Sequence, residues 1–293
     1  MAYTLSNNLL RISVSPHGAE LQSIENIVTG FQYLWQGDPR FWKRRSPVLF
    51  PIVGAVWNGV FRMDGREYPM GQHGFARDME FVPVEDASED ELWFRLTATP
   101  ETLEKYPRDF SLEIGYRLLN ENITVMWRVK NNDSCPMSFQ IGAHPAFNLP
   151  DFNAADSVHA YFNFDVAAAE AQIIDEKGCV GNRMKEVLLT DEQMLPVTED
   201  TFSEDALIFG GNRLHRVSLL TKERNPLLTL LFRSPYVGLW APALDAPFVC
   251  IEPWYGRADS VGFDGDFAAR EAVRTLAPGE TFEASYMIII DNV

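Results

Sequence analysis

The protein has 293 residues, of which 46% are hydrophobic and 12% aromatic, and 25 basic against 41 acidic residues give a formal net charge of −16. This composition supplies a large packed core and excludes a disordered chain. The acidic balance argues against a nucleic-acid partner, because phosphate binding requires a surplus of basic charge.

Alternation of apolar and polar residues with a period of two dominates the chain and predicts strands. In chain order, the expected strands cover residues 9–15, 92–99, 112–118, 123–129, 227–233, 248–252 and 282–290. The short polar turn at 120–122 makes two of these strands an antiparallel hairpin, since a parallel crossover needs a dozen residues or more. Residues 100–106, which begin with proline, predict a helix of one or two turns, and residues 154–171 have no clear pattern.

Many short strands separated by turn residues predict an all-β fold, a large antiparallel sandwich with few short helices. Turn signals stand at Asn58-Gly59, Asp64-Gly65 and Pro278-Gly279. No internal repeat or linker divides the chain, so residues 1–293 are expected to form a single domain.

The cysteines and the apolar stretches bear on the cellular compartment. Cys135, Cys179 and Cys250 form no C-x-x-C pair, which predicts buried, reduced thiols rather than a disulfide framework or a zinc ribbon. The apolar stretches are far shorter than the roughly 20 residues of a membrane helix, and the N-terminus lacks a basic region before an apolar run. We therefore expect a cytoplasmic protein with no membrane partner.

Two of the five histidines lie in unusual surroundings. His73 stands beside Gly74, and His144 precedes Pro145, which favours an extended backbone at a strand end. Either histidine alone is more often structural, but the pair is equally consistent with acid–base chemistry near neutral pH.

A carboxylate in an apolar strand is uncommon, because buried Glu requires a partner or a function. Glu252 lies in such a strand and is followed by Trp254. It is either paired with an arginine such as Arg257 or is a general base whose pKa is tuned by its apolar setting. Trp240 and Trp254 offer flat faces on which sugar C–H groups pack.

A basic triplet, Lys43-Arg44-Arg45, precedes an apolar run in this acidic chain. Such a triplet is commonly a surface salt-bridge cluster. Alternatively, one of its arginines points into a cleft and holds substrate oxygens.

Four blocks together resemble the aldose 1-epimerase (galactose mutarotase-like) family and, within it, the LacX-like branch. They are Arg45-Ser46-Pro47-Val48-Leu49-Phe50-Pro51, Gln72-His73-Gly74-Phe75-Ala76-Arg77, His144-Pro145-Ala146-Phe147-Asn148-Leu149 and Glu252-Pro253-Trp254. The resemblance implies an antiparallel β-supersandwich with a sugar in an open cleft and no cofactor or metal.

The resemblance also implies roles for individual residues. Glu252 would be the general base and His144 the general acid, while His73, Arg45 and Asp205 would bind and orient the sugar. The block around His73 departs from the best-known galactose mutarotases, which have a second histidine there. Arg77 instead matches an arginine of a related branch that acts on hexose 6-phosphates.

The expected function is interconversion of the α and β anomers of a hexose by ring opening and reclosure, with acid and base on opposite sides of the hemiacetal. A neighbouring carboxylate, Asp205 or Glu252, is expected to keep His144 protonated. Free sugar is preferred over a phosphorylated one, because the acidic protein repels anions. The partner is thus a small-molecule sugar, and the protein is expected to be a monomer or weak homodimer.

Four other functions stay open at this point. The first is a hexose-6-phosphate mutarotase, in which Arg45 and Arg77 would clamp the phosphate. The second is a non-catalytic carbohydrate-binding or sensing protein. The third is a glycoside hydrolase with a carboxyl pair, and the fourth is a metal site built from His73, His144 and Glu252. For the last two, the spacing of these residues along the sequence gives no positive indication.

Overall fold

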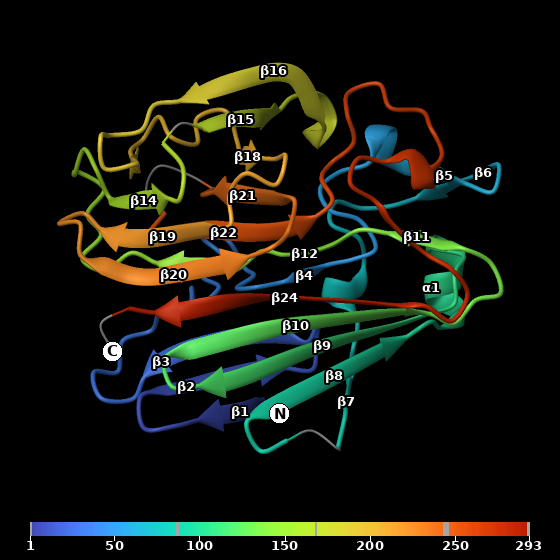
Figure 1. The fold of residues 1–293 in the computed structure, drawn as a ribbon, viewed down its shortest axis with the longest axis horizontal. Helices are drawn as coiled ribbons and strands as arrows, with labels where there is room; N and C mark the ends of the chain where they lie inside the picture. The colour runs from blue at the N-terminus through green and yellow to red at the C-terminus, as the bar shows by residue number, and fades with distance from the viewer. Residues whose placement is uncertain (1, 86–87, 168, 243–245, 292–293) are drawn as a thin grey trace.

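Two large antiparallel sheets lie face to face in the computed structural model, which describes residues 2–85, 88–167, 169–242 and 246–291 (Figure 1). Their inner faces meet in one hydrophobic core, where Tyr255 of one sheet packs edge-on against Trp127 and Phe282 of the other. The expected all-β sandwich is therefore confirmed. No helix in the described part of the chain combines the length and hydropathy needed to span a bilayer.

The first sheet has nine strands and carries the predicted hairpin near its middle (Figure 1). Its strands, in order across the sheet, are β17 (Met194–Val197), β14 (Ala160–Phe164), β19 (Arg216–Thr221), β20 (Pro226–Phe232), β24 (Thr281–Ile290), β10 (Asn122–Asn131), β9 (Phe110–Leu119), β8 (Glu91–Thr97) and β7 (Val82–Pro83).

The second sheet has eight strands, and β22 lies near its centre. Its strands are, in order, β16 (Val180–Val187), β15 (Ala169–Ile174), β18 (Leu207–Phe209), β21 (Tyr236–Trp240), β22 (Phe248–Tyr255), β12 (Ile141–Ala143) and β4 (Val48–Leu49), with β13 (Ala146–Asn148) also paired to β22.

Smaller elements complete the fold. They are a three-stranded sheet of β1 (Tyr3–Ser6), β2 (Leu10–Ser15) and β3 (Glu20–Asn26), the pairs β5 (Val60–Met63) with β6 (Arg66–Pro69) and β11 (Met137–Phe139) with β23 (Arg274–Leu276), the helix α1 (Pro100–Lys105), and 3₁₀ turns at Trp57–Gly59, Ala76–Asp78, Glu176–Gly178 and Phe267–Ala269.

The locally encoded predictions are confirmed. β9 and β10 pair as a hairpin, and helix α1 begins at Pro100 behind a capping box formed by Thr99. The unassigned stretch 154–171 contains β14 and the start of β15, while residue 168 lies outside the described residues. Cys179 and Cys250 are buried free thiols, whereas the prediction was wrong for Cys135, which is partly exposed.

The outer face of the β9–β10 hairpin is less exposed to solvent than the alternation of apolar and polar residues predicts. Glu113 points away from the core but is buried, because Arg95 and Arg128 from the flanking strands bond its two carboxylate oxygens at 2.6 and 2.7 Å. Cross-strand ion pairs therefore cover a face that the sequence pattern presents as polar and solvated.

Candidate active site

Strand β22 divides its residues between the core and a cavity. Val249 and Ile251 belong to the core between the sheets, whereas Cys250, Glu252 and Trp254 belong to the opposite face. This division follows from the two-residue period of a strand. The whole strand is buried, since other residues cover both of its faces.

Glycines on the two neighbouring strands make room for the Trp254 indole. A Cβ at Gly238 of β21 would lie 2.5 Å from the ring, and one at Gly142 of β12 would lie 2.6 Å from it. The ring therefore lies flat across both strands only because these positions lack side chains, and it forms one wall of the cavity.

Gly238→Ala is expected to displace the Trp254 ring and to lower kcat/KM for the anomer interconversion expected from the sequence by about 10²-fold, since a misplacement near 1 Å at a reacting site has that cost. Gly71→Ala is the matched control, because a Cβ there has no neighbour within 4 Å. Steady-state rates of both variants check this, and equal rates would show that the ring position does not matter.

His144 follows β12, and its segment is held in place by the backbone of residues 45–47. Its backbone N–H donates to the Pro47 carbonyl at 3.1 Å, and the N–H of Ala146 donates to the Arg45 carbonyl at 2.9 Å. The imidazole stacks on Trp42 at 4.6 Å and meets the edge of Trp240 at 5.4 Å. These contacts fix both the backbone and the ring plane.

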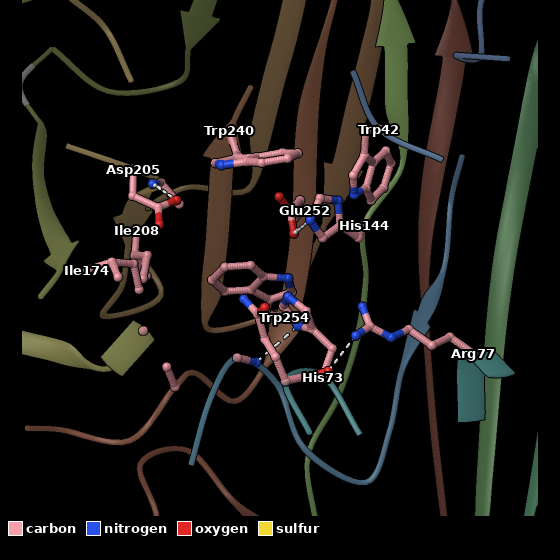
Figure 2. Close-up of a pocket in the computed structure, with 15 residues that line it drawn as sticks. Trp42, His73, Arg77, His144, Ile174, Asp205, Ile208, Trp240, Glu252 and Trp254 are labelled. Atoms are coloured by element: carbon pink, nitrogen blue, oxygen red, sulfur yellow. Dashed lines mark hydrogen bonds and ion pairs between the residues drawn. The ribbon is translucent and has the colours of Figure 1, made fainter. Parts of the chain in front are cut away.

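The His144 and Glu252 side chains meet inside the cavity. Nε2 of His144 lies 3.3 Å from Oε2 of Glu252, and Figure 2 shows the pair between Trp240 and Trp254. The two groups thus lie side by side, so the expectation that they occupy opposite sides of a hemiacetal is wrong. Strand alternation on β22 and the short link after β12 bring them into contact.

His73 has a fixed tautomer. Its backbone has a φ of 66°, and its Nδ1 accepts a hydrogen bond from the Gly54 N–H at 3.1 Å. Burial, reinforced by His144, Arg77 and Arg44, lowers the pKa of His73 well below its ordinary value. The neutral ring therefore carries its proton on Nε2 and can donate it to a ligand oxygen.

A cavity of about 260 Å³ collects most of the predicted residues. Those that line it are His73, Arg77, His144, Asp205, Trp240 and Glu252 (Figure 2). Residues outside that set that also line it include Trp42, Gln72 and Trp254. Nothing in the sequence marked Trp42 as a cavity residue except its place beside the basic triplet. Its stacking on His144 arises only in the folded protein.

Two arginines do not make the contacts expected from the sequence. Arg45 does not line the cavity; its guanidinium donates to the Gln22 carbonyl at 3.0 Å. Arg44 pairs with Asp78 at 2.9 Å, and its charge lowers the pKa of His73 and His144. Arg257 contacts Ala258 and Ser260 rather than Glu252, so the proposed arginine–Glu252 pair does not form.

Burial shifts the pKa values of the His144–Glu252 pair in opposite directions. It lowers the pKa of His144 to about 3, with Arg77 contributing, and it raises the pKa of Glu252 well above the ordinary value, with Asp205 contributing. A carboxylate therefore does not hold His144 protonated in the free protein, contrary to expectation. Both shifts favour the neutral form of the group, which places the proton of the pair on Glu252 rather than on His144.

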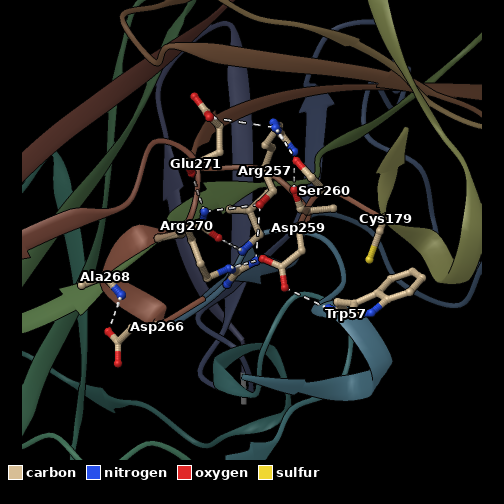
Figure 3. Close-up of polar contacts among 12 residues, drawn as sticks. Trp57, Cys179, Arg257, Asp259, Ser260, Asp266, Ala268, Arg270 and Glu271 are labelled. Atoms are coloured by element: carbon tan, nitrogen blue, oxygen red, sulfur yellow. Dashed lines mark hydrogen bonds and ion pairs between the residues drawn. The ribbon is translucent and has the colours of Figure 1, made fainter. Parts of the chain in front are cut away.

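A buried ion pair supports the cavity wall from behind. Nε of Arg270 donates to Oδ1 of Asp259 at 2.6 Å, and Oδ2 accepts from the Trp57 backbone N–H at 2.9 Å (Figure 3). The N–H of Asp259 also donates to the Ala55 carbonyl at 3.0 Å. These bonds join the segment after β22 to residues 55–57, next to the wall residues Gly54 and Ala258.

The fold and this cavity define a galactose mutarotase-like protein. The chain superposes on a galactose mutarotase related enzyme from Lactobacillus acidophilus with a TM-score of 0.91, 33% identity and coverage of 100% of this chain and 98% of that one. It also superposes on a galactose mutarotase-like protein from Lactobacillus casei with a TM-score of 0.92, 28% identity and coverage of 99% and 100%.

The sequence comparisons identify the family. The aldose 1-epimerase family model matches residues 1–285, and the chain belongs to this family. The chromosomal protein LacX of Lactococcus lactis is 29% identical over 301 residues, which span 100% of each chain. The resemblance to the LacX-like branch is thereby confirmed.

Proposed function

We propose that the protein is an aldose 1-epimerase that interconverts the α and β anomers of a free hexose. The observation that carries the proposal is the 3.3 Å contact between Nε2 of His144 and Oε2 of Glu252 at a cavity walled by indoles. The ring oxygen and the C1 hydroxyl of an aldose are bonded to the same carbon. An acid and a base that lie side by side can therefore reach both oxygens at once.

In the proposed reaction, the Glu252 carboxylate takes the proton of the C1 hydroxyl while the His144 imidazolium gives its proton to the ring oxygen. The bond from C1 to the ring oxygen breaks, and the C1 hydroxyl oxygen becomes the aldehyde oxygen. Rotation about the C1–C2 bond turns the other face of the aldehyde toward the freed hydroxyl. Reclosure reverses both transfers: His144 takes back a proton from the hydroxyl that attacks C1, and Glu252 gives its proton to the aldehyde oxygen, so the pair ends as it began.

The pair enters this reaction with a single proton. In the free protein the proton is more stable on Glu252, because burial disfavours both the Glu252 carboxylate and the His144 imidazolium. A sugar hydroxyl that donates to the carboxylate stabilises the charged form and shifts the proton across the 3.3 Å contact to Nε2 of His144. The reactive arrangement thus arises by transfer within the pair and requires no proton from solvent.

This shared proton predicts an unusual pH profile. The pKa of His144 is lowered to about 3, so kcat/KM should not fall as the pH drops through 6.5, the ordinary pKa of imidazole. It should fall toward pH 3, where the pair gains a second proton, and on the other side above the raised pKa of Glu252, where the pair loses its only proton. Polarimetric rates, corrected for spontaneous exchange, check this; a loss of rate on acidification through pH 6.5 would contradict it.

The remaining cavity groups suit an uncharged polyol. The Nε2–H of His73 is a donor, the exposed Asp205 carboxylate is an acceptor, and the indoles of Trp240 and Trp254 supply faces for sugar C–H groups. We propose that these residues orient the sugar over the acid–base pair.

A hexose 6-phosphate is the second candidate substrate, favoured by Arg77. This arginine lines the cavity, and its buried Nε has no hydrogen-bond partner among the described residues. Comparing anomer exchange of glucose and galactose with that of glucose 6-phosphate, by exchange NMR, tests the choice. We expect a higher kcat/KM for the free sugars, whereas a preference for the phosphate, lost in Arg77→Gln, would assign the second substrate.

The same assay separates an enzyme from a binding protein. Catalysis predicts anomer exchange above the spontaneous rate in proportion to protein concentration. Calorimetric sugar binding without any acceleration would show that the cleft only binds carbohydrate.

A further inference from the structure

A cysteine completes a cluster of metal-ligating side chains beside the acid–base pair. A ring nitrogen of His144, Sγ of Cys250 and a carboxylate oxygen of Glu252 all lie within 4.8 Å of one another, and all three residues are buried. Cys250 and Glu252 share the cavity-side face of β22 because they stand two residues apart. We propose that this cluster binds Zn²⁺ and that the bound ion stops sugar anomer exchange.

The ligand set matches zinc in type and number. Zn²⁺ binds Cys sulfur at about 2.3 Å and His nitrogen or carboxylate oxygen at about 2.0–2.2 Å in a tetrahedral arrangement. Those bond lengths place neighbouring ligand atoms roughly 3.5 Å apart, so the atoms of the cluster, which lie within 4.8 Å of one another, need to close by no more than roughly 1.3 Å. Three protein ligands leave a fourth position for water or a sugar oxygen.

Two atoms of the cluster residues have no hydrogen-bond partner among the described residues. Oε2 of Glu252 and Nδ1 of His144 are buried and accept no hydrogen bond from the described residues. The described residues place no lysine or arginine in an ion pair with Glu252, whose only such contact is His144. A thiolate and a carboxylate together balance the two charges of the ion, and the sulfur favours Zn²⁺ over Mg²⁺ or Ca²⁺.

Binding at this place would be inhibitory, a consequence that rests on the proposed function. The ion would occupy a carboxylate oxygen and a ring nitrogen of the two residues that exchange protons with the sugar. It would also lie where the hemiacetal must approach. Zinc is therefore expected to inhibit in competition with the sugar rather than to serve as a cofactor.

Co²⁺ is the spectroscopic probe for the site, because a cobalt–thiolate bond absorbs in the near ultraviolet. We expect the full chain to bind about one Co²⁺, to show this band and to lose it when Zn²⁺ is added. Cys250→Ser should lose the band, keep its metal-free exchange rate within about twofold, and require at least about tenfold more zinc for half inhibition. Cys135→Ser, which removes a distant thiol, should behave as wild type.

Further variants keep the test decisive. Should Cys250→Ser fold poorly, Cys250→Ala replaces it, and Glu252→Gln should independently weaken cobalt binding. Absence of the band in wild type, or its persistence in the Cys250 variants, would overturn the site. Binding without inhibition would overturn the inhibitory role. A cobalt band in a protein that exchanges no sugar even when metal-free would instead refute the proposed function and support the metal site.

Discussion

Glu252→Gln is expected to lower catalysed anomer exchange by about 10²–10⁴-fold, the contribution of one positioned proton transfer. Glutamine has nearly the same shape but cannot take the C1 hydroxyl proton. The loss should appear in kcat as well as in kcat/KM, because the proton moves only in the reaction. Polarimetry or exchange NMR at saturating sugar measures it.

The control is Glu104→Gln, an equivalent change on an exposed residue of α1, which should leave the rate unchanged. His144→Ala should cause a loss of similar size, and the double variant should lose little more than either single one, because residues that act as a unit are not additive. A Glu252→Gln protein that retains near wild-type rate would remove Glu252 from the mechanism.

Asp259→Asn is expected to lower the free energy of unfolding by about 3–5 kcal/mol, the usual cost of leaving one member of a buried ion pair alone. The side chains of Arg270 and Asp259 are only 1% and 3% exposed, so the arginine charge would have no access to water. Asparagine preserves the shape and an acceptor for the Trp57 N–H, so the loss is mainly electrostatic. Urea unfolding at equilibrium measures the difference.

Two comparisons test this explanation. Glu67→Gln breaks a surface pair with Arg62 at 2.8 Å and should change stability by no more than about 1 kcal/mol. Adding Arg270→Met to Asp259→Asn removes the stranded charge and should recover part of the lost stability. If Asp259→Asn were as mild as Glu67→Gln, the pair would not support the segment behind the cavity wall.

Local patterns were sufficient for the elements that depend on neighbours in sequence. The β9–β10 hairpin follows from two alternating runs across a short turn, and α1 follows from Pro100 with acids behind it. Residues 154–171 gave no such signal, since β14 pairs with β17 and β19, which lie far along the chain. Strand pairing at that range depends on tertiary contacts that no local pattern records.

Motifs likewise identified most of the residues that line the cavity but not their geometry. The histidine and glutamate blocks marked His73, His144 and Glu252, and all three line one cavity. The expectation that Arg45 holds the sugar is wrong: the backbone of residues 45–47 holds the His144 segment, while the Arg45 guanidinium donates to the Gln22 carbonyl. Which side chain of a run faces a cavity depends on the strand opposite it.

The sequence by itself determined that the chain folds as an antiparallel β protein and which residue types are available for acid–base chemistry, because both follow from periodicity and composition. Only the tertiary structure decided that His144 and Glu252 lie side by side, that Trp42 covers the imidazole, and that burial disfavours the charged form of both members of the pair. Desolvation and proximity arise from segments more than a hundred residues apart, so they exist only once those segments have packed together.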